Sequence, residues 1–147
     1  MLTGIFGTGA IIQTDINLTI QIVMLIFIVI SLIYKNKRKF KTHAELMGIA
    51  VILHLISFFA VMLPSFYYNL DYFVTATSDL GAQTIWIHAI PGALSMILGI
   101  FLVAAWVLSP ANIAACSKRK RLMDITIILW SISLIFGIAS YMFYYVY

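Results

Sequence analysis

Three histidines, His43, His54 and His88, lie in or beside long apolar stretches of this 147-residue chain. Neutral imidazole is the commonest protein ligand for metals, and it also ligates haem iron. His43 and His54 are eleven residues apart, so on a helix they share one face, about 16 Å apart along the axis. Ionisable groups inside apolar segments are costly and usually functional. These three residues are therefore the first candidates for chemistry.

The histidines define two candidate sites. His54 and His88 belong to different apolar segments and are candidates to clamp a b-type haem, with Gly92 leaving room for the ring. His43 and Met47 are one helical turn apart, and an imidazole with a thioether suits copper(I). Other residues expected to enter this second site come from a later part of the chain: Cys116, Met123 and Asp124.

A simpler interpretation of the histidines is also open. Each makes one hydrogen bond to a neighbouring helix, for example to Asn17, Gln21 or Ser140, or handles protons, and no cofactor is bound. The sequence contains no CxxC, HExxH or glycine-rich phosphate loop, and no Ser/His/Asp set in a plausible order. We therefore predict that the protein is not an enzyme.

The composition indicates the environment of these residues. The chain is 63% hydrophobic and 10% charged, whereas a soluble domain is about half apolar and about a quarter charged. All nine basic residues fall in two clusters, 35–41 and 118–121, beside apolar stretches. Clusters placed in this way act as topology signals, so the net charge of +4 does not indicate nucleic-acid binding. The single cysteine, Cys116, excludes an internal disulfide.

Four stretches have the length of about 20 apolar residues that a membrane helix needs. They run from about 16–34, 43–63, 84–108 and 122–145. The loops after the first and third stretches carry all the Lys and Arg residues, so the positive-inside rule places both loops in the cytoplasm and both termini outside. We predict an all-α fold: residues 1–147 form a single transmembrane domain, an antiparallel four-helix bundle.

Local signals set the expected helix ends. Asp15 is a plausible N-cap of the first helix, and Thr42 with Glu45 matches the capping-box pattern at the start of the second. Pro64 is expected to help end the second helix. The long connection 65–83 is expected to carry a short interfacial helix.

Small and polar residues recur at intervals of three and four in each stretch, which places them on one side of each helix. Gly and Ser let membrane helices approach closely, so these stripes are predicted to face the bundle interior. The expected inward positions are Asn17, Gln21, Met24, Ile28 and Ser31; His43, Met47, Ala50, His54 and Ser57; His88, Gly92, Ser95, Gly99 and Val103 or Trp106; and Trp130, Ser133, Gly137, Ser140 and Tyr144.

Several short motifs are shared with a known family. They are Thr42-His43-Ala44-Glu45-Leu46-Met47, then His88, then Lys118-Arg119-Lys120-Arg121-Leu122, then Trp130-Ser131-Ile132-Ser133 and Gly137-Ile138-Ala139-Ser140-Tyr141. In this order the chain resembles the YozB/CtaM-like family of small four-helix membrane proteins, a domain of unknown function. The resemblance implies a role in the maturation of haem-copper terminal oxidases, together with haem handling, in a prokaryotic plasma membrane.

The leading hypothesis is a non-catalytic accessory or assembly protein of a respiratory metalloenzyme. Haem b would be held by His54 and His88, and copper, less favoured, by His43 and Met47. One alternative is a b-type cytochrome that carries electrons. Another is a structural subunit of a larger membrane enzyme, such as a copper membrane monooxygenase, with no cofactor. The expected partners are membrane lipid and the subunits of the larger enzyme or terminal oxidase.

Overall fold

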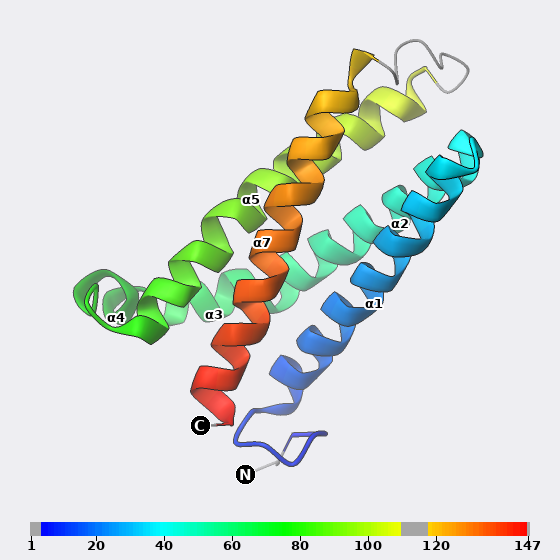
Figure 1. Ribbon diagram of the computed structural model, residues 1–147. Helices are drawn as coiled ribbons and strands as arrows, with labels where there is room; N and C mark the ends of the chain where they lie inside the picture. Colours follow the sequence, from blue (N-terminus) through cyan, green and yellow to red (C-terminus); the bar gives the residue numbers. More distant parts are fainter. Residues whose placement is uncertain (1–3, 110–117, 147) are drawn as a thin grey trace.

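The structure is a computed structural model that describes residues 4–109 and 118–146, all of the secondary structure there being helical. Four of its helices are long and apolar enough to cross a membrane, which is compatible with a multi-pass helical membrane protein. The elements are α1 (Ile12–Asn36), α2 (Phe40–Ser57), the π-helical turn η1 (Phe58–Met62), α3 (Leu63–Tyr68), α4 (Leu70–Thr75), α5 (Leu80–Val107) and α7 (Lys120–Tyr145) (Figure 1).

The second helix differs from its sequence prediction at both ends. It begins at Phe40, with Lys39 as N-cap and no side-chain cap, so Thr42 and Glu45 already lie inside the helix and form no capping box. It also continues past Pro64, which lies in the first turn of α3 after the π-helical turn. A proline fits there because the first turn of a helix does not need its missing N–H. The expected helix in the connection 65–83 is present as α4.

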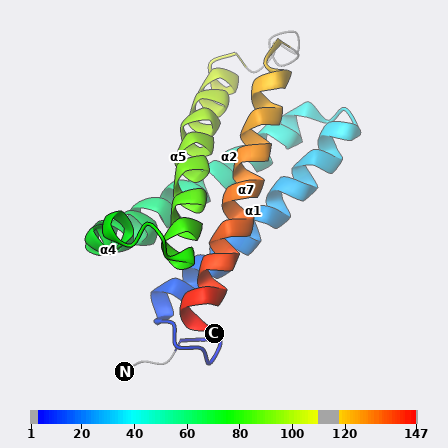
Figure 2. The ribbon, with the colours of Figure 1, turned by 60° about the vertical axis from the view of Figure 1, so that its left-hand side comes forward.

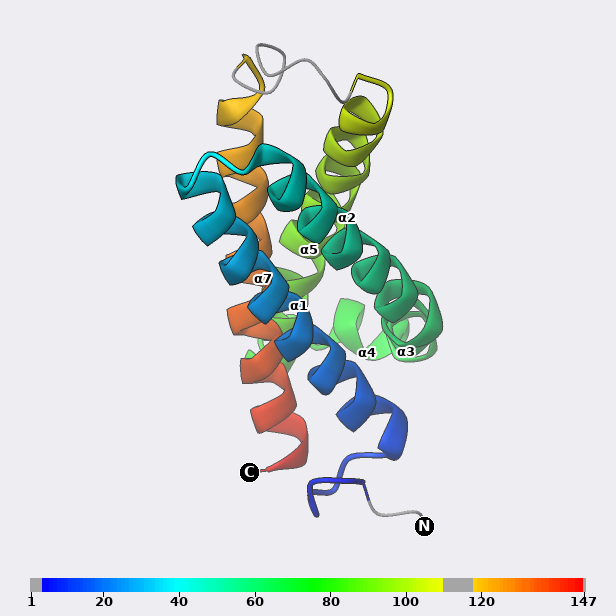
Figure 3. The ribbon, with the colours of Figure 1, turned by 90° about the vertical axis from the view of Figure 1, so that its right-hand side faces the viewer.

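The helices associate as two pairs. α1 packs chiefly against α2, α5 packs chiefly against α7, and α2 also touches α5, where Gly99 leaves room for Val51. Figure 2 shows α5 and α7 side by side, and Figure 3 shows α2 leading away from α7 towards α3 and α4. We call α1 with α2 the first pair and α5 with α7 the second pair.

The two ends of the molecule have different contents. The turn 37–39 and the adjoining ends of α5 and α7 lie together, as the 3.7 Å contact between Lys35 Nζ and Asp124 Oδ1 also shows (Figure 1). We call this the basic end, since it carries the described basic residues. The chain termini and α4 lie towards the opposite end, which we call the terminal end.

The core between the pairs is small. Its buried apolar residues are Met24, Ile28, Ala50, Val51 and Trp130. In each long helix, only 17–22% of an 18-residue apolar stretch is buried within the chain. The remaining surface is mostly Ile, Leu, Val and Phe, which water does not solvate well. That surface needs lipid or another protein against it.

The predicted inward stripes are largely confirmed by burial. Gln21, Ser31, His54, Ser95 and Ser133 are all buried. The last helix departs from the prediction at its terminal end. Tyr144 is 43% exposed, and Tyr141 is buried in its place.

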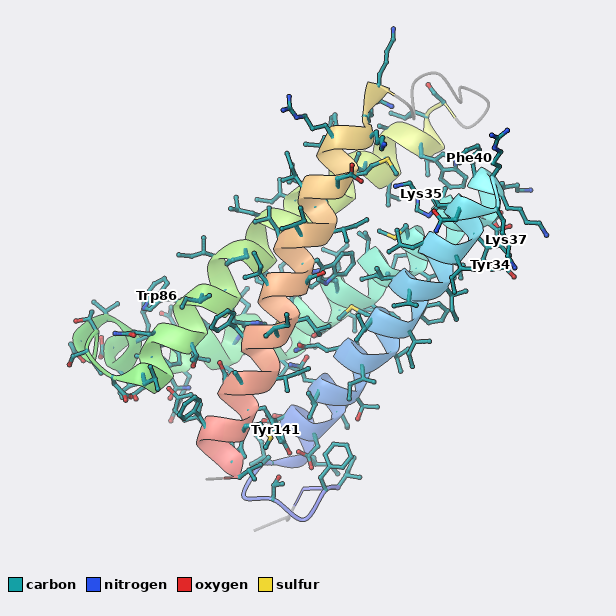
Figure 4. All side chains as sticks on the ribbon, in the orientation of Figure 1. Tyr34, Lys35, Lys37, Phe40, Trp86 and Tyr141 are labelled. Carbon is teal, nitrogen blue, oxygen red and sulfur yellow. The ribbon has the colours of Figure 1, made fainter. Side chains whose placement is uncertain are left out.

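Tyr141 is turned inward by a buried carboxylate. Its hydroxyl lies 2.6 Å from Asp15 Oδ1 and 2.8 Å from Thr8 Oγ1. Asp15 Oδ2 accepts a further bond from the Phe6 amide at 3.0 Å, so the carboxylate ties the N-terminal segment and α7 to α1. Asp15 is therefore not an N-cap; that position is Ile11. Figure 4 shows Tyr141 beside the N-terminal segment.

A second contact set fixes α4 at the terminal end. Trp86, labelled in Figure 4, donates through Nε1 to the Phe73 carbonyl oxygen at 3.0 Å. The Phe66 ring packs against both Phe73 and Trp86. Asp79, which precedes α5, accepts a hydrogen bond from Tyr72 on α4. That bond holds the pKa of the Asp79 carboxyl below its ordinary value and raises the pKa of Tyr72.

Candidate functional site

His43 on α2 is held by one serine of α1. The Ser31 hydroxyl donates its single proton to the His43 carbonyl oxygen at 3.0 Å. The same hydroxyl oxygen lies 2.6 Å from His43 Nδ1, and the Ser31 carbonyl oxygen lies 3.1 Å from it. Both oxygens therefore act as acceptors towards Nδ1, which must carry the ring proton. In the neutral ring, Nε2 is left with a free lone pair.

His88 on α5 is held in the same way by a serine of α7. The Ser133 hydroxyl donates to the His88 carbonyl oxygen at 2.9 Å. His88 Nδ1 lies 2.7 Å from the Ser133 carbonyl oxygen and 3.2 Å from its hydroxyl oxygen. Each helix pair thus contains one reciprocal histidine–serine clasp. Metal-ligating histidines are commonly oriented through a carbonyl on the other ring nitrogen, as here.

His54 has a different environment. Its ring stacks on Trp130 of α7, with centroids 5.0 Å apart and planes 26° apart. It is buried, and among residues 4–109 and 118–146 no hydrogen-bond partner of its ring nitrogens is found. Its only specific contact in the part of the chain that the structure describes is therefore through the ring face.

The structure brings His54 and His88 to one face of α7, because Trp130 and Ser133 are three residues apart on that helix. The space around them is filled. A Cβ added to Gly137 would lie 2.8 Å from His88 Nδ1, and one added to Gly92 would lie 2.7 Å from Ser133 Oγ. Gly92 was expected to leave room for a haem ring, but the clasp uses that room.

A haem therefore fits this pair only in part. The ligand chemistry is suitable, since His88 offers Nε2 and both nitrogens of His54 are without a described partner. The space is not, because Trp130 covers one face of His54, and Gly137 and Ser133 pack against His88.

A cavity of about 550 Å³ lies at the basic end. Its walls come from α2, α5, α7 and the turn before α2, and both His43 and Met47 line it. Met123 also lines it, whereas Asp124 pairs with Lys35. Cys116 lies outside the described residues. Within the described parts of the chain no three His, Cys, Asp or Glu side chains gather as metal ligands, so copper at His43 and Met47 stays a prediction.

Sequence reasoning found the histidines but missed their partners. It proposed Asn17, Gln21 or Ser140, whereas Ser31 and Ser133 make the clasps. Both serines were already on the predicted inward stripes of the neighbouring helices, so the available signal was that they face the same interior as the histidines. No protein-family model, curated protein or solved structure matches the chain. The resemblance to the YozB/CtaM-like family remains a prediction from the motifs.

Proposed function

We propose that this chain is a non-catalytic accessory or assembly protein of a respiratory metalloenzyme, and that it handles haem through its histidines. The observation that carries the proposal is the repeated clasp, which fixes the tautomer of His43 and of His88 and leaves Nε2 of each ring with a lone pair and no partner in the described part of the chain. An imidazole oriented through Nδ1 is pre-organised to bind a metal through Nε2. Two such rings in one small membrane domain favour metal or haem handling over simple helix packing.

The packing around His54 and His88 favours transient handling over a resident cofactor. A stand-alone b-type cytochrome holds its haem in a preformed slot between helices. Here the slot is closed by the stack of His54 on Trp130 and by the contacts of His88 with Ser133. Binding then requires the helix pairs to separate, which suits a protein that receives a haem and passes it to a partner.

The exposed surface supports a partner enzyme. Less than a quarter of an 18-residue apolar stretch in each span is buried inside the chain, so wide apolar faces are available to other transmembrane helices. The same observation favours the second candidate function, a structural subunit of a larger membrane enzyme such as a copper membrane monooxygenase. In that case the clasps serve only to join helices, and no haem is involved.

The proposal includes a topology. The spans run antiparallel in a prokaryotic plasma membrane, the basic end faces the cytoplasm, and both termini lie outside. The gathering of the described basic residues at one end supports it. Single cysteines in a Cys116→Ser background test it: Lys37→Cys should be shielded from an impermeant maleimide in intact cells, and Asn69→Cys should react. The opposite pattern overturns the topology.

The haem proposal is tested by purification in mild detergent from cells that make the respiratory enzyme. We expect a Soret band, sharp bands on reduction, and co-purification of oxidase subunits by mass spectrometry. His88→Ala and His54→Phe should abolish the bands, although His54→Phe keeps a ring on Trp130. A colourless protein that co-purifies in fixed ratio with a large enzyme would replace the proposal with the structural subunit.

A further inference from the structure

The cavity at the basic end has two unlike parts. Its deeper wall is apolar and includes Met47, Val51, Leu102 and Trp106. Its rim is cationic, with Arg38, Lys39, Lys41 and Arg119 among the lining residues. A volume of about 550 Å³ lies within the range of about 300–1,000 Å³ that small-molecule sites occupy.

The rim is only partly neutralised in the part of the chain that the structure describes. No Asp or Glu is among the described residues that line the cavity. Glu45 pairs with one rim residue, Lys41, at 3.9 Å, and Asp124 pairs with Lys35, which is not among the lining residues. Arg38 and Lys39 have no carboxylate partner among residues 4–109 and 118–146.

One of these cationic residues, Arg38, has an unfavourable backbone conformation. Arg38 has φ of +57°, in the left-handed region that residues with a side chain seldom adopt. Glycine or asparagine would satisfy this turn more easily. An arginine in this turn indicates that its side chain has a role that outweighs the backbone strain. That side chain lines the cavity.

We infer that this cavity binds an amphiphile with an apolar body and an anionic head, which is either a phosphate or a carboxylate. The body would lie against Val51, Leu102 and Trp106, within the span region. The head would meet Arg38, Lys39 and Arg119, where the helices end and lipid headgroups begin. Basic pockets between membrane helices recognise anionic headgroups by this charge complementarity. The site lies apart from the pair His54 and His88, but it shares His43 with the proposed function; its haem arm rests on that function, whereas its lipid arm does not.

Two sources supply such a molecule: an anionic phospholipid of the surrounding leaflet, and a metalloporphyrin with its carboxylates. His43 distinguishes them. No partner of its Nε2 is found among residues 4–109 and 118–146, and the residue lines the cavity wall. A phospholipid has no group that needs this nitrogen, whereas the metal of a porphyrin would be ligated by it.

The full-length protein in detergent, stripped of lipid, tests the inference by native mass spectrometry with added phosphatidylglycerol, phosphatidylcholine or haem. The rim variant is Arg38→Gln with Lys39→Gln and Arg119→Gln. The matched control is Lys37→Gln with Lys120→Gln and Arg121→Gln, which removes the same charge from the same two segments but not from the cavity. Figure 4 shows Lys37 on the other side of the turn from Lys35.

We expect the unmodified protein to bind phosphatidylglycerol or haem at one molecule per chain, and phosphatidylcholine at least about tenfold more weakly than phosphatidylglycerol. The rim variant should lose at least about tenfold in affinity for the anionic ligand, and the control less than about twofold. Binding that is equal in the two variants, or no preference for an anionic head together with no haem binding, overturns the inference.

A second pair of variants keeps the test decisive if the rim variant does not fold. Ala105→Phe fills the cavity that Ala105 lines, whereas Ala104→Phe places the same ring on the exposed face one residue earlier. Only the first should remove the bound ligand; equal retention in both overturns the inference. His43→Ala then identifies the source: it should abolish haem binding but leave phosphatidylglycerol binding within about twofold.

Discussion

The terminal end and the basic end of this molecule join the two helix pairs in opposite ways. At the terminal end, the buried Asp15 carboxylate accepts bonds from Tyr141 of α7 and from the Phe6 amide, and Thr8 completes the network. At the basic end, a cavity separates the pairs, and the ion pair between Lys35 and Asp124, both partly exposed, crosses between them.

The two ends therefore have different structural roles. Buried, fully partnered hydrogen bonds are costly to break, whereas an exposed ion pair contributes little. The terminal end is therefore the fixed joint of the two pairs. The basic end has a cavity and a histidine whose Nε2 has no partner among the residues that the structure describes, so it is the end where the structure allows binding and separation.

Breaking the joint should have the largest effect. Tyr141→Phe removes a donor from the buried Asp15 and leaves that carboxylate short of a partner. The expected loss of stability is about 1–3 kcal/mol, because a buried polar group left unpaired pays its desolvation cost. Reversible denaturation in detergent measures it, with Tyr68→Phe, at a 90% exposed position, as the control. Equal stability of the two variants would mean that the terminal end is not a joint.

Removal of a serine hydroxyl from either histidine–serine clasp should cause the next largest loss of stability. Ser133→Ala and Ser31→Ala each remove a hydroxyl but keep the backbone carbonyl that accepts from Nδ1. We expect a loss of about 0.5–1.5 kcal/mol for each, the usual net contribution of one hydrogen bond. Ser131→Ala, at an exposed position of α7, is the control and should change stability less. A clasp variant as stable as this control would contradict a structural role for the hydroxyl.

Acidification should gradually weaken the attachment of α4 at the terminal end. The bond from Tyr72 holds the pKa of Asp79 below its ordinary value of 3.8. A lowered folded-state pKa means that the contribution is complete above the ordinary value and is lost as pH falls through the folded value. The hydrogen-exchange protection factors of α4 amides, which correct the exchange rate for the intrinsic rate at each pH, should therefore fall below about pH 4, relative to pH 6. In Asp79→Asn the protection factors should be equal at both pH values; a pH-dependent protection factor in that variant would contradict the assignment.

The sequence predicted the spans and their inward faces because both depend on local periodicity. Stretches of about 20 apolar residues and recurring Gly and Ser positions are visible without knowledge of the partner helix. Each predicted span falls on one long helix, and most of the stripe residues are buried. The half-buried exceptions are Asn17, Met47, His88, Val103, Trp106 and Gly137, and Tyr144 is exposed. The start of α2 was placed three residues late, because the capping-box pattern at Thr42 was given more weight than the basic turn before it.

The contacts between helices could not be predicted from the sequence. Nothing in the spacing states that His43 pairs with Ser31, or that Tyr141 turns inward towards Asp15. The cavity was also missed, since it arises from the separation of the two pairs at one end and not from any one segment. His43 and Met47, the residues of the predicted copper site, both line this cavity, and copper binding there stays a prediction.

The smallest predicted effect tests the comparison most directly. Lys35→Ala removes the ion pair that crosses the basic end, with side chains 24% and 49% exposed, so stability should fall by less than about 1 kcal/mol. Lys41→Ala, which breaks the pair with Glu45 inside α2, is the matched control. Both should lie well below Tyr141→Phe in the same denaturation assay. If Lys35→Ala instead destabilises the protein as much as Tyr141→Phe, both ends are fixed joints. Separation at the basic end would then no longer explain how a ligand enters between the two pairs.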